Sequence, residues 1–266
     1  MTQHSGLGTQ HSALMLLAID IGNSSTKFGV FDSENLVNQI SIPTIRTNSA
    51  DKIYELIKPE INGQISFVII SSVVTELEKS YRTLAEKLLN AKVLFVDNKF
   101  DSGLKINYFP PKTLGVDRLI AAFAAAAKYG KPIIVCDFGT ATTIDAVNSK
   151  GEFLGGIIAP GMNILAETLF QKTSKLPKVE IKKPKSIFGN STITSIQSGI
   201  YHGYAGLVDG ILQKMIDELG ENAKIIATGG LASKIAKSSE LIEFIDEKLM
   251  LDGLKLISQN HLCLRG

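Results

Sequence analysis

Hydrophobic residues in the N-terminal part of the chain fall into short runs of strand length. The runs at 16–22 and 27–32 predict two β-strands joined through a polar break, and residues 38–44 extend the pair into a meander. Buried strands are predicted at 65–74 and 92–97, where apolar residues are nearly continuous.

Helical patterns alternate with these strands. Apolar residues recur three and four positions apart in 50–61, a segment that ends near Pro59, and an amphipathic helix is predicted at 77–90. Strands flanked by helices predict the α/β fold class.

The second part of the chain has a similar order of elements. An alanine-rich helix is predicted at 114–130, with Gly130 as its C-terminal stop. It is followed by a strand, a polar break and two further strands over 131–161. The remaining predictions are a basic surface loop at 179–187, a helix at 212–220, a strand entering a glycine turn at 224–230, and either helix or loop at 238–249.

Two short segments resemble each other. AIDIGNSSTKFGVFD and VCDFGTATTIDAVNS share an aspartate and a glycine after an apolar run, and Asp20 and Asp137 lie 117 residues apart. A repeat of this size predicts two like domains that face each other across a cleft. We assign 15–117 and 118–266 to these domains and 1–14 to a disordered extension, so that the fold begins at Met15.

The chemistry of the repeated segment suits a phosphate. A glycine after the strand lets backbone N–H groups approach a phosphate without a Cβ in the way, and hydroxyl side chains add donors. The aspartate can hold a cation or orient a water, and Lys27 adds positive charge at the first copy. The alternative is an ordinary β-turn, in which Asp and Gly are common. Two copies at a domain-sized separation favour the phosphate site.

Other nucleotide-binding classes lack support. The chain has no GxxxxGK[ST] and no GxGxxG, and the protein-kinase motifs HRD and DFG are absent. Twenty-eight basic and 26 acidic residues leave a net charge of +2, which does not indicate nucleic acid or an anionic membrane as a partner.

Cysteine content and hydropathy bear on location. Only Cys136 and Cys263 occur, so a disulfide framework is not expected and a reducing, cytoplasmic location fits. The apolar stretch at 14–19 stops at Asp20, far short of the ~20 residues that cross a bilayer.

Taken in order, the motifs resemble a known superfamily and then a family. Two hairpins of this type resemble those of the acetate kinase, sugar kinase, Hsp70 and actin superfamily, in which ATP lies between two ribonuclease-H-like domains. TGG at 228–230 resembles the second glycine-rich turn of that superfamily. DIGN, NYFPPKTLGVDR, DFGTATTIDAV, GGIIAPGM and STITSIQSGI, in this order, closely resemble the type III pantothenate kinases over nearly the whole chain from Met15.

The resemblance implies that ATP phosphorylates the terminal hydroxyl of pantothenate, the first step of coenzyme A synthesis. It implies magnesium, bound with ATP near Asp20, and a monovalent cation, potassium or ammonium, bound by Asp137. The residues implied to contact ATP are Asp20, Ile21, Gly22, Asn23, Ser24, Ser25, Thr26, Lys27 and Thr140. Ser24 replaces the threonine usual in the family, which keeps the hydroxyl and loses the methyl.

The resemblance also implies a pantothenate site and a homodimer. Asp117 would be the catalytic base, and the substrate and cation sites would lie near the dimer interface. The residues implied to line the pantothenate site are Tyr108, Gly115, Val116, Asp117, Arg118 and Thr192.

Residue chemistry agrees with this assignment. A primary hydroxyl is a poor nucleophile and needs a carboxylate to take its proton. Asp117 can project from the first turn of the predicted helix, while Arg118 binds an anionic substrate or balances the Asp117 carboxylate. The alternative for the pair is a helix N-terminal acid with a surface salt bridge.

Two other functions stay open. One is a kinase of the same superfamily with another small acceptor, against which the spacing of Tyr108 from the Gly-x-Asp-Arg motif argues. The other is a non-catalytic regulator, against which the joint presence of the acidic and hydroxyl motif residues argues. We expect Cys136 and His202 to have packing or surface roles, and Gly155 and Gly156 to allow close backbone approach or a plain turn.

Overall fold

The computed structural model describes residues 15–32 and 35–263, and the predicted extension 1–14 lies outside them. The contacts between residues divide the chain into two compact units, and the division falls between Val96 and Asp97. This division falls earlier than the predicted 117/118 boundary, because the strand and side chains just before residue 118 pair with partners in the second unit. Among the described residues, no helix is both long and apolar enough to cross a lipid bilayer.

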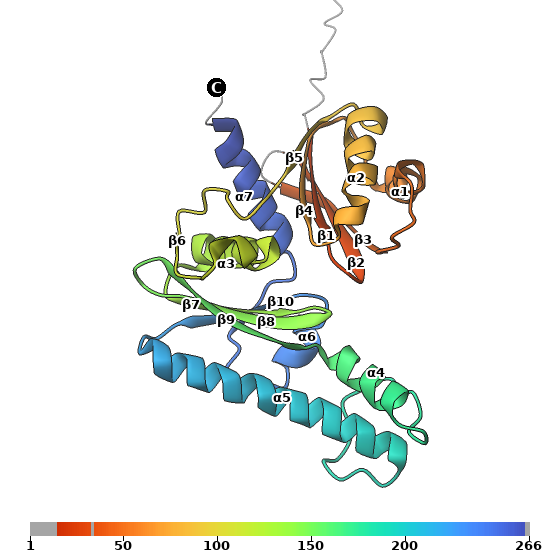
Figure 1. The fold of residues 1–266 in the computed structure, drawn as a ribbon, viewed down its shortest axis with the longest axis vertical. Coiled ribbons are helices and arrows are strands. Elements are labelled where there is room, and N and C mark those ends of the chain that lie inside the picture. The colour runs from red at the N-terminus through yellow and green to blue at the C-terminus, as the bar shows by residue number, and fades with distance from the viewer. Residues whose placement is uncertain (1–14, 33–34, 264–266) are drawn as a thin grey trace, which may run out of the picture. The chain divides into compact units, whose positions relative to one another are not determined.

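The first unit contains a five-stranded sheet in the order β3-β2-β1-β4-β5 (Figure 1). Its strands are β1 (Met15–Ile21), β2 (Ser25–Asp32), β3 (Asn35–Pro43), β4 (Ile65–Ser72) and β5 (Lys92–Phe95). The first three form an antiparallel meander, and β4 pairs in parallel with both β1 and β5. All five were predicted from the hydrophobic runs.

One face of this sheet carries the core of the first unit. It packs against α1 (Ala50–Ile57) and α2 (Glu78–Thr83), which continues as a π-helical turn at Leu84–Leu88. Short 3₁₀ turns, Lys58–Glu60 and Thr75–Leu77, follow α1 and precede α2. Ser49 caps α1 by accepting a hydrogen bond from the backbone N–H of Lys52.

The second unit contains a six-stranded sheet in the order β11-β10-β7-β8-β9-β6. Its strands are β6 (Lys105–Ile106), β7 (Ile133–Phe138), β8 (Ala141–Val147), β9 (Glu152–Pro160), β10 (Lys224–Thr228) and β11 (Phe244–Ile245). Here β7, β8 and β9 form the antiparallel meander, and β10 pairs in parallel with β7 and β11. The strand order and directions of the first unit are thus repeated, with β6 added at one edge. The predicted repeat is therefore confirmed at the level of topology, and so is the α/β fold class.

Helices cover both faces of the second sheet. The helices are α3 (Val116–Tyr129), α4 (Met162–Lys172), α5 (Thr192–Leu219), α6 (Ala232–Ala236) and α7 (Leu249–Cys263), with a 3₁₀ turn at Pro111–Thr113. Apolar residues of α5 and α6 form one core with the inward side chains of β7, β8 and β10. The helix α3 packs on β7, β8 and α7, and Figure 1 shows α3 and α5 on opposite sides of the sheet. The segment 238–249 is loop with β11, not helix.

Candidate active site

The first predicted phosphate loop is the turn between β1 and β2. Asp20 and Lys27 lie directly opposite each other in the antiparallel pair, at the end nearest the turn. Gly22 donates its backbone N–H to the carbonyl of Ser25 at 3.1 Å, which closes the turn. Asn23 is exposed at the tip. The carboxylate and the ammonium group therefore lie beside a short loop in which Asn23 and Ser24 are exposed.

Thr44 fixes the base of this turn. Its hydroxyl donates to the carbonyl of Gly22 at 2.8 Å, and its backbone N–H donates to the carbonyl of Ser24 at 3.0 Å. Thr26 is fully buried with its hydroxyl 2.9 Å from that of Thr44, and Ile21 is part of the hydrophobic core. Thr26 and Ile21 were both predicted to contact ATP, but their side chains are buried and support the loop from inside.

Two glycines from other segments pack closely against the second predicted loop, between β7 and β8. Gly139 and Thr140 are exposed at its tip. A Cβ on Gly161 would lie 2.4 Å from the carbonyl oxygen of Thr140, and a Cβ on Gly229 would lie 2.4 Å from a carboxylate oxygen of Asp137. Gly229 also has a φ of +92°, a left-handed conformation that favours glycine. The sequence motifs APG and TGG thus pack directly around this turn.

Asp137, the last residue but one of β7, lies between two hydroxyl residues of neighbouring strands. It is in register with Thr143 of β8 and Thr228 of β10. Alternation along β7 puts Cys136 and Phe138 in the core that α5 covers, so Asp137 points to the other face, the one on which α3 packs. Burial raises the pKa of the Cys136 thiol well above its usual range, which agrees with the predicted packing role.

The same face carries a buried ion pair. Arg118 donates to both carboxylate oxygens of Asp145, from Nε at 3.0 Å and from Nη2 at 2.5 Å, and about 6% of Arg118 is exposed. Burial alone would lower the pKa of Arg118, but its bonds to Asp145 outweigh this effect and raise it. Burial raises the pKa of Asp145, and Arg118 opposes the rise. The alternative of a surface salt bridge for Arg118 is therefore excluded, because its guanidinium turns inward to β8.

Tyr108 completes the arrangement around Arg118. Its ring centroid is 5.4 Å from the guanidinium carbon, and Nη1 of Arg118 is 3.5 Å from the tyrosine hydroxyl. Gly155, with a φ of +89°, leaves room for the ring, since an added Cβ would be 3.3 Å from Cδ2 of Tyr108. Gly156 is closer still to its neighbours, because its Cβ would overlap the carbonyl oxygen of Ile144. These glycines serve close approach, as expected.

Asp117 lies in the first turn of α3 beside this cluster. One carboxylate oxygen accepts the backbone N–H of Arg118 at 2.9 Å, and a Cβ on Gly115 would meet that oxygen at 2.5 Å. The side chain is partly exposed, and its negative charge contributes to the raised pKa of Asp145. A carboxylate in this position is available to a ligand, while its backbone is fixed by the helix.

Thr192, which was predicted to line the pantothenate site, lies on a different helix from Arg118. It is exposed at the start of α5, just after the cap residue Ser191, whose side chain accepts the N–H of Thr194. The helix α5 covers the face of the sheet opposite to α3 (Figure 1), and Thr192 is the first residue of α5, whereas Arg118 belongs to α3.

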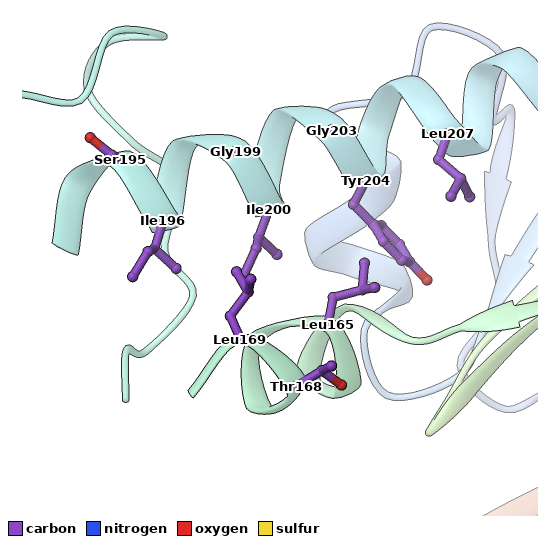
Figure 2. Close-up of a pocket in the computed structure, with 10 residues that line it drawn as sticks. All are labelled: Leu165, Thr168, Leu169, Ser195, Ile196, Gly199, Ile200, Gly203, Tyr204 and Leu207. Atoms are coloured by element: carbon purple, nitrogen blue, oxygen red, sulfur yellow. The ribbon is translucent and has the colours of Figure 1, made fainter. Parts of the chain in front are cut away.

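An apolar groove lies between α4 and α5. Its volume is about 600 Å³, and its wall includes Leu165 and Leu169 of α4 and Ile196 and Ile200 of α5, whose side chains converge in Figure 2. None of the predicted catalytic or phosphate-binding residues lines it.

Comparison with known proteins decides the family. Residues 16–214 match the family model for type III pantothenate kinases. Type III pantothenate kinases of Koribacter versatilis and Syntrophus aciditrophicus are 44% and 45% identical to the chain, each over 93% of its length and over 96% and 100% of their own. The chain belongs to the type III pantothenate kinase family. It is accordingly an enzyme of the phosphotransferase class, and the resemblance drawn from its motifs is confirmed.

Solved structures bear on the fold alone. A Campylobacter jejuni protein assigned to the Baf family of transcriptional activators superposes with a TM-score of 0.58 at 20% identity, covering 92% of this chain and 98% of its own. The polyphosphate/ATP-glucomannokinase of an Arthrobacter strain gives 0.50 at 15% identity, covering 93% and 100%. These likenesses confirm the fold shared with sugar kinases.

Asp145 was not among the predicted site residues. Its signal was present in the sequence, where a single aspartate interrupts the apolar positions of TTIDAV inside a strand. A buried acid in such a run needs a cationic partner. The sequence did not show that this partner was Arg118.

Proposed function

We propose that this type III pantothenate kinase family member transfers the γ-phosphoryl group of ATP to the terminal hydroxyl of pantothenate, giving 4'-phosphopantothenate for coenzyme A synthesis. The observation that carries the proposal is the grouping of Asp117, Arg118 and Tyr108 on one face of the second sheet, in a chain that matches the family model. We expect this activity in the cytoplasm.

Asp117 is the general base in this proposal. Its carboxylate takes the proton of the pantothenate hydroxyl as the oxygen attacks phosphorus, and the leaving ADP takes the electron pair of the broken P–O bond. The first turn of α3 suits this role because the backbone is rigid and the side chain remains partly exposed.

Each hairpin turn is a phosphate-binding loop for ATP in this proposal. In this proposal, backbone N–H groups of the turns and the hydroxyls of Ser24 and Thr140 donate to phosphate oxygens, and Lys27 adds a positive charge. Asp20 suits a hydrated magnesium ion, which when bound offsets the negative charge of the phosphates. Asp137, flanked by Thr143 and Thr228, has the oxygen donors for the monovalent cation, potassium or ammonium.

The pantothenate site in this proposal consists of the 115–118 segment with Tyr108, and Thr192 from the second subunit of a homodimer. Two of the five N–H donors of Arg118 bind Asp145, so this proposal assigns its remaining N–H groups and the hydroxyl of Tyr108 to the anionic substrate. The proposal assigns Thr192 to another copy because α5, which carries it, and α3, which carries Arg118, cover opposite faces of one sheet.

Features of α5 support the homodimer. Four glycines of this helix, Gly199, Gly203, Gly206 and Gly210, would meet no atom of the described residues within 4 Å if they carried a Cβ. Exposed glycines inside a helix cost about 1 kcal/mol each relative to alanine, a cost that close packing of a second helix can offset. The apolar groove beside α4 continues this surface and includes Gly199 and Gly203 (Figure 2). Phe188 and Ile193 are exposed nearby in the sequence.

ADP release distinguishes the two alternative functions, a kinase for another acceptor and a non-catalytic regulator, from the proposed one. A kinase for another acceptor would release ADP with a different small alcohol. A regulator would release none, and the Baf-family likeness at 20% identity bears on the fold only.

The test is ADP release from ATP with pantothenate, magnesium and either potassium or sodium, for the wild type and Asp117→Asn. We expect potassium-dependent turnover that falls at least 100-fold in the variant, since general base catalysis typically contributes that much or more. Equal turnover in both proteins would exclude Asp117 as the base. No turnover with pantothenate under any cation would exclude the proposed reaction.

A further inference from the structure

One buried hydroxyl of the first unit has no partner. Ser71 lies in β4 with none of its surface exposed, and its Oγ makes no hydrogen bond to any group among the described residues. Buried hydroxyls in proteins are nearly always satisfied, and one that is not lowers stability. An unsatisfied group of this kind needs a reason such as a ligand or a bound water.

Ser71 is the direct neighbour of Asp20. The two residues are in register between the parallel strands β4 and β1, and Lys27 follows on the other side of Asp20 in β2. Alternation places Ile19 and Ile70 in the core with α1 and α2, so Asp20, Lys27 and Ser71 form a row on the other face of the sheet. This row lies next to the phosphate-loop turn.

We infer that Ser71 is a further binding residue for magnesium–ATP, whose hydroxyl accepts a hydrogen bond from a water of the hydrated magnesium ion. This inference rests on the proposed function, in which Asp20 binds that ion. Magnesium dehydrates reluctantly and is usually held through its waters and one or two carboxylates, so a hydroxyl beside the carboxylate matches its chemistry. A serine oxygen has free lone pairs for such a water.

The alternative is that Ser71 is a packing residue without a ligand. Both readings predict that Ser71→Ala does not lower the stability of the ligand-free protein, because the substitution removes an unsatisfied group. Only the inference predicts weaker binding of magnesium–ATP. The next residue supplies a matched control, since Ser72 has a satisfied hydroxyl that donates to the carbonyl of Val74 and accepts its N–H, both at 3.1 Å.

The experiment compares the wild-type chain, Ser71→Ala and Ser72→Ala by calorimetric titration with magnesium–ATP and with ATP in EDTA, together with melting temperatures. We expect Ser71→Ala to weaken magnesium–ATP binding about tenfold, as for one hydrogen bond to a charged group, and to leave metal-free ATP within about twofold. Its melting temperature should equal or exceed that of the wild type. Ser72→Ala should melt lower and bind magnesium–ATP normally.

Several results would overturn the inference. Wild-type affinity for magnesium–ATP in Ser71→Ala would show a packing role, and equal weakening of both ATP forms would exclude the metal-bound water. Either result together with pantothenate turnover by the wild type leaves the proposed function intact. A tenfold loss of magnesium–ATP binding without pantothenate turnover supports Ser71 and rejects the acceptor. A wild-type chain that binds no magnesium–ATP contradicts both.

Discussion

At the scale of single residues, the buried pair of Arg118 and Asp145 holds the guanidinium group of the proposed substrate site in place. The carboxylate occupies two of the guanidinium donors and fixes the plane of the group. Tyr108 then stacks against it from the loop before α3. In the proposed reaction, Asp145 acts through Arg118 and is a positioning residue.

We predict that Asp145→Ala lowers the free energy of unfolding by about 3 kcal/mol, because it leaves Arg118 buried without a counter-charge. The double variant Arg118→Met, Asp145→Ala should recover most of that loss, since two apolar residues can replace a buried ion pair. Both variants should raise the KM for pantothenate with little change in the KM for ATP. Urea unfolding and steady-state kinetics measure these effects, and a double variant with the wild-type KM would contradict the role.

The residues of this pair show where sequence reasoning reached its limit. The motif Gly-x-Asp-Arg identified Arg118, and the phosphate-loop pattern identified Asp137, because each lies at a turn with a local signature. Asp145 is inside a strand, and its partner is 27 residues away in sequence. Such a pairing depends on tertiary packing, which a single sequence does not specify.

At the scale of elements, the short edge strand β6 holds the loop that carries Tyr108. It pairs in parallel with β9, and the backbone N–H of Asn107 continues the pairing to the carbonyl of Phe153 at 2.9 Å. Side chains reinforce the pairing of β6 with β9. The carboxylate of Glu152 accepts hydrogen bonds from the side chains of Lys105 at 2.6 Å and Asn148 at 2.7 Å. These bonds lower the pKa of Glu152 to about 2.

This pKa predicts a pH dependence of stability. A carboxylate whose pKa is lowered by folding contributes stability that is present above its ordinary pKa, near 4.5, and is lost as the pH falls towards about 2. We therefore expect the melting temperature of Glu152→Gln to lie below that of the wild type at about pH 6, and the gap to narrow as the pH falls below 4.5. Lys105→Met should show the same narrowing. A gap that is constant with pH would contradict the assignment.

The elements themselves divide into those with and without a clear sequence pattern. Short apolar runs predicted β1, β4 and β7, and the alanines of α3 predicted that helix. Only the last part of α5 was predicted, because glycines recur along its earlier turns and are unfavourable in an isolated helix. Its capping box at Ser191 was the available signal. Packing against the sheet outweighs the low propensity of this segment.

At the scale of the whole molecule, the repeated topology and the proposed homodimer have different bases. The repeat follows from the two hairpin motifs, which a single chain carries. A dimer depends on the surfaces of two copies. The hydrophobic periodicity of one chain does not show which of its surface residues a second copy would bury. Here the indication is geometric, since α5, which carries Thr192, and α3, whose Arg118 contacts Tyr108, cover opposite faces of one sheet. The resemblance nevertheless implies that Thr192 and Tyr108 belong to one pantothenate site.

This geometry predicts complementation between two inactive variants. Asp117→Asn removes the base from a subunit's own site, and Thr192→Arg blocks the site of its partner. In a mixed dimer, one of the two sites then receives both substitutions and the other receives neither. Random exchange of equal amounts should therefore restore about a quarter of wild-type turnover.

The measurement is ADP release before and after the two purified variants are mixed and allowed to exchange subunits. A matched pair, Asp117→Asn mixed with Tyr108→Ala, should stay inactive, because both residues belong to the same side of the sheet and every mixed site is defective. Recovery in the first mixture alone would assign Thr192 to the partner's site. No recovery in either mixture, with mixed dimers shown by mass spectrometry, would mean that each subunit uses its own Thr192, and the pantothenate site would then need a different arrangement of α5.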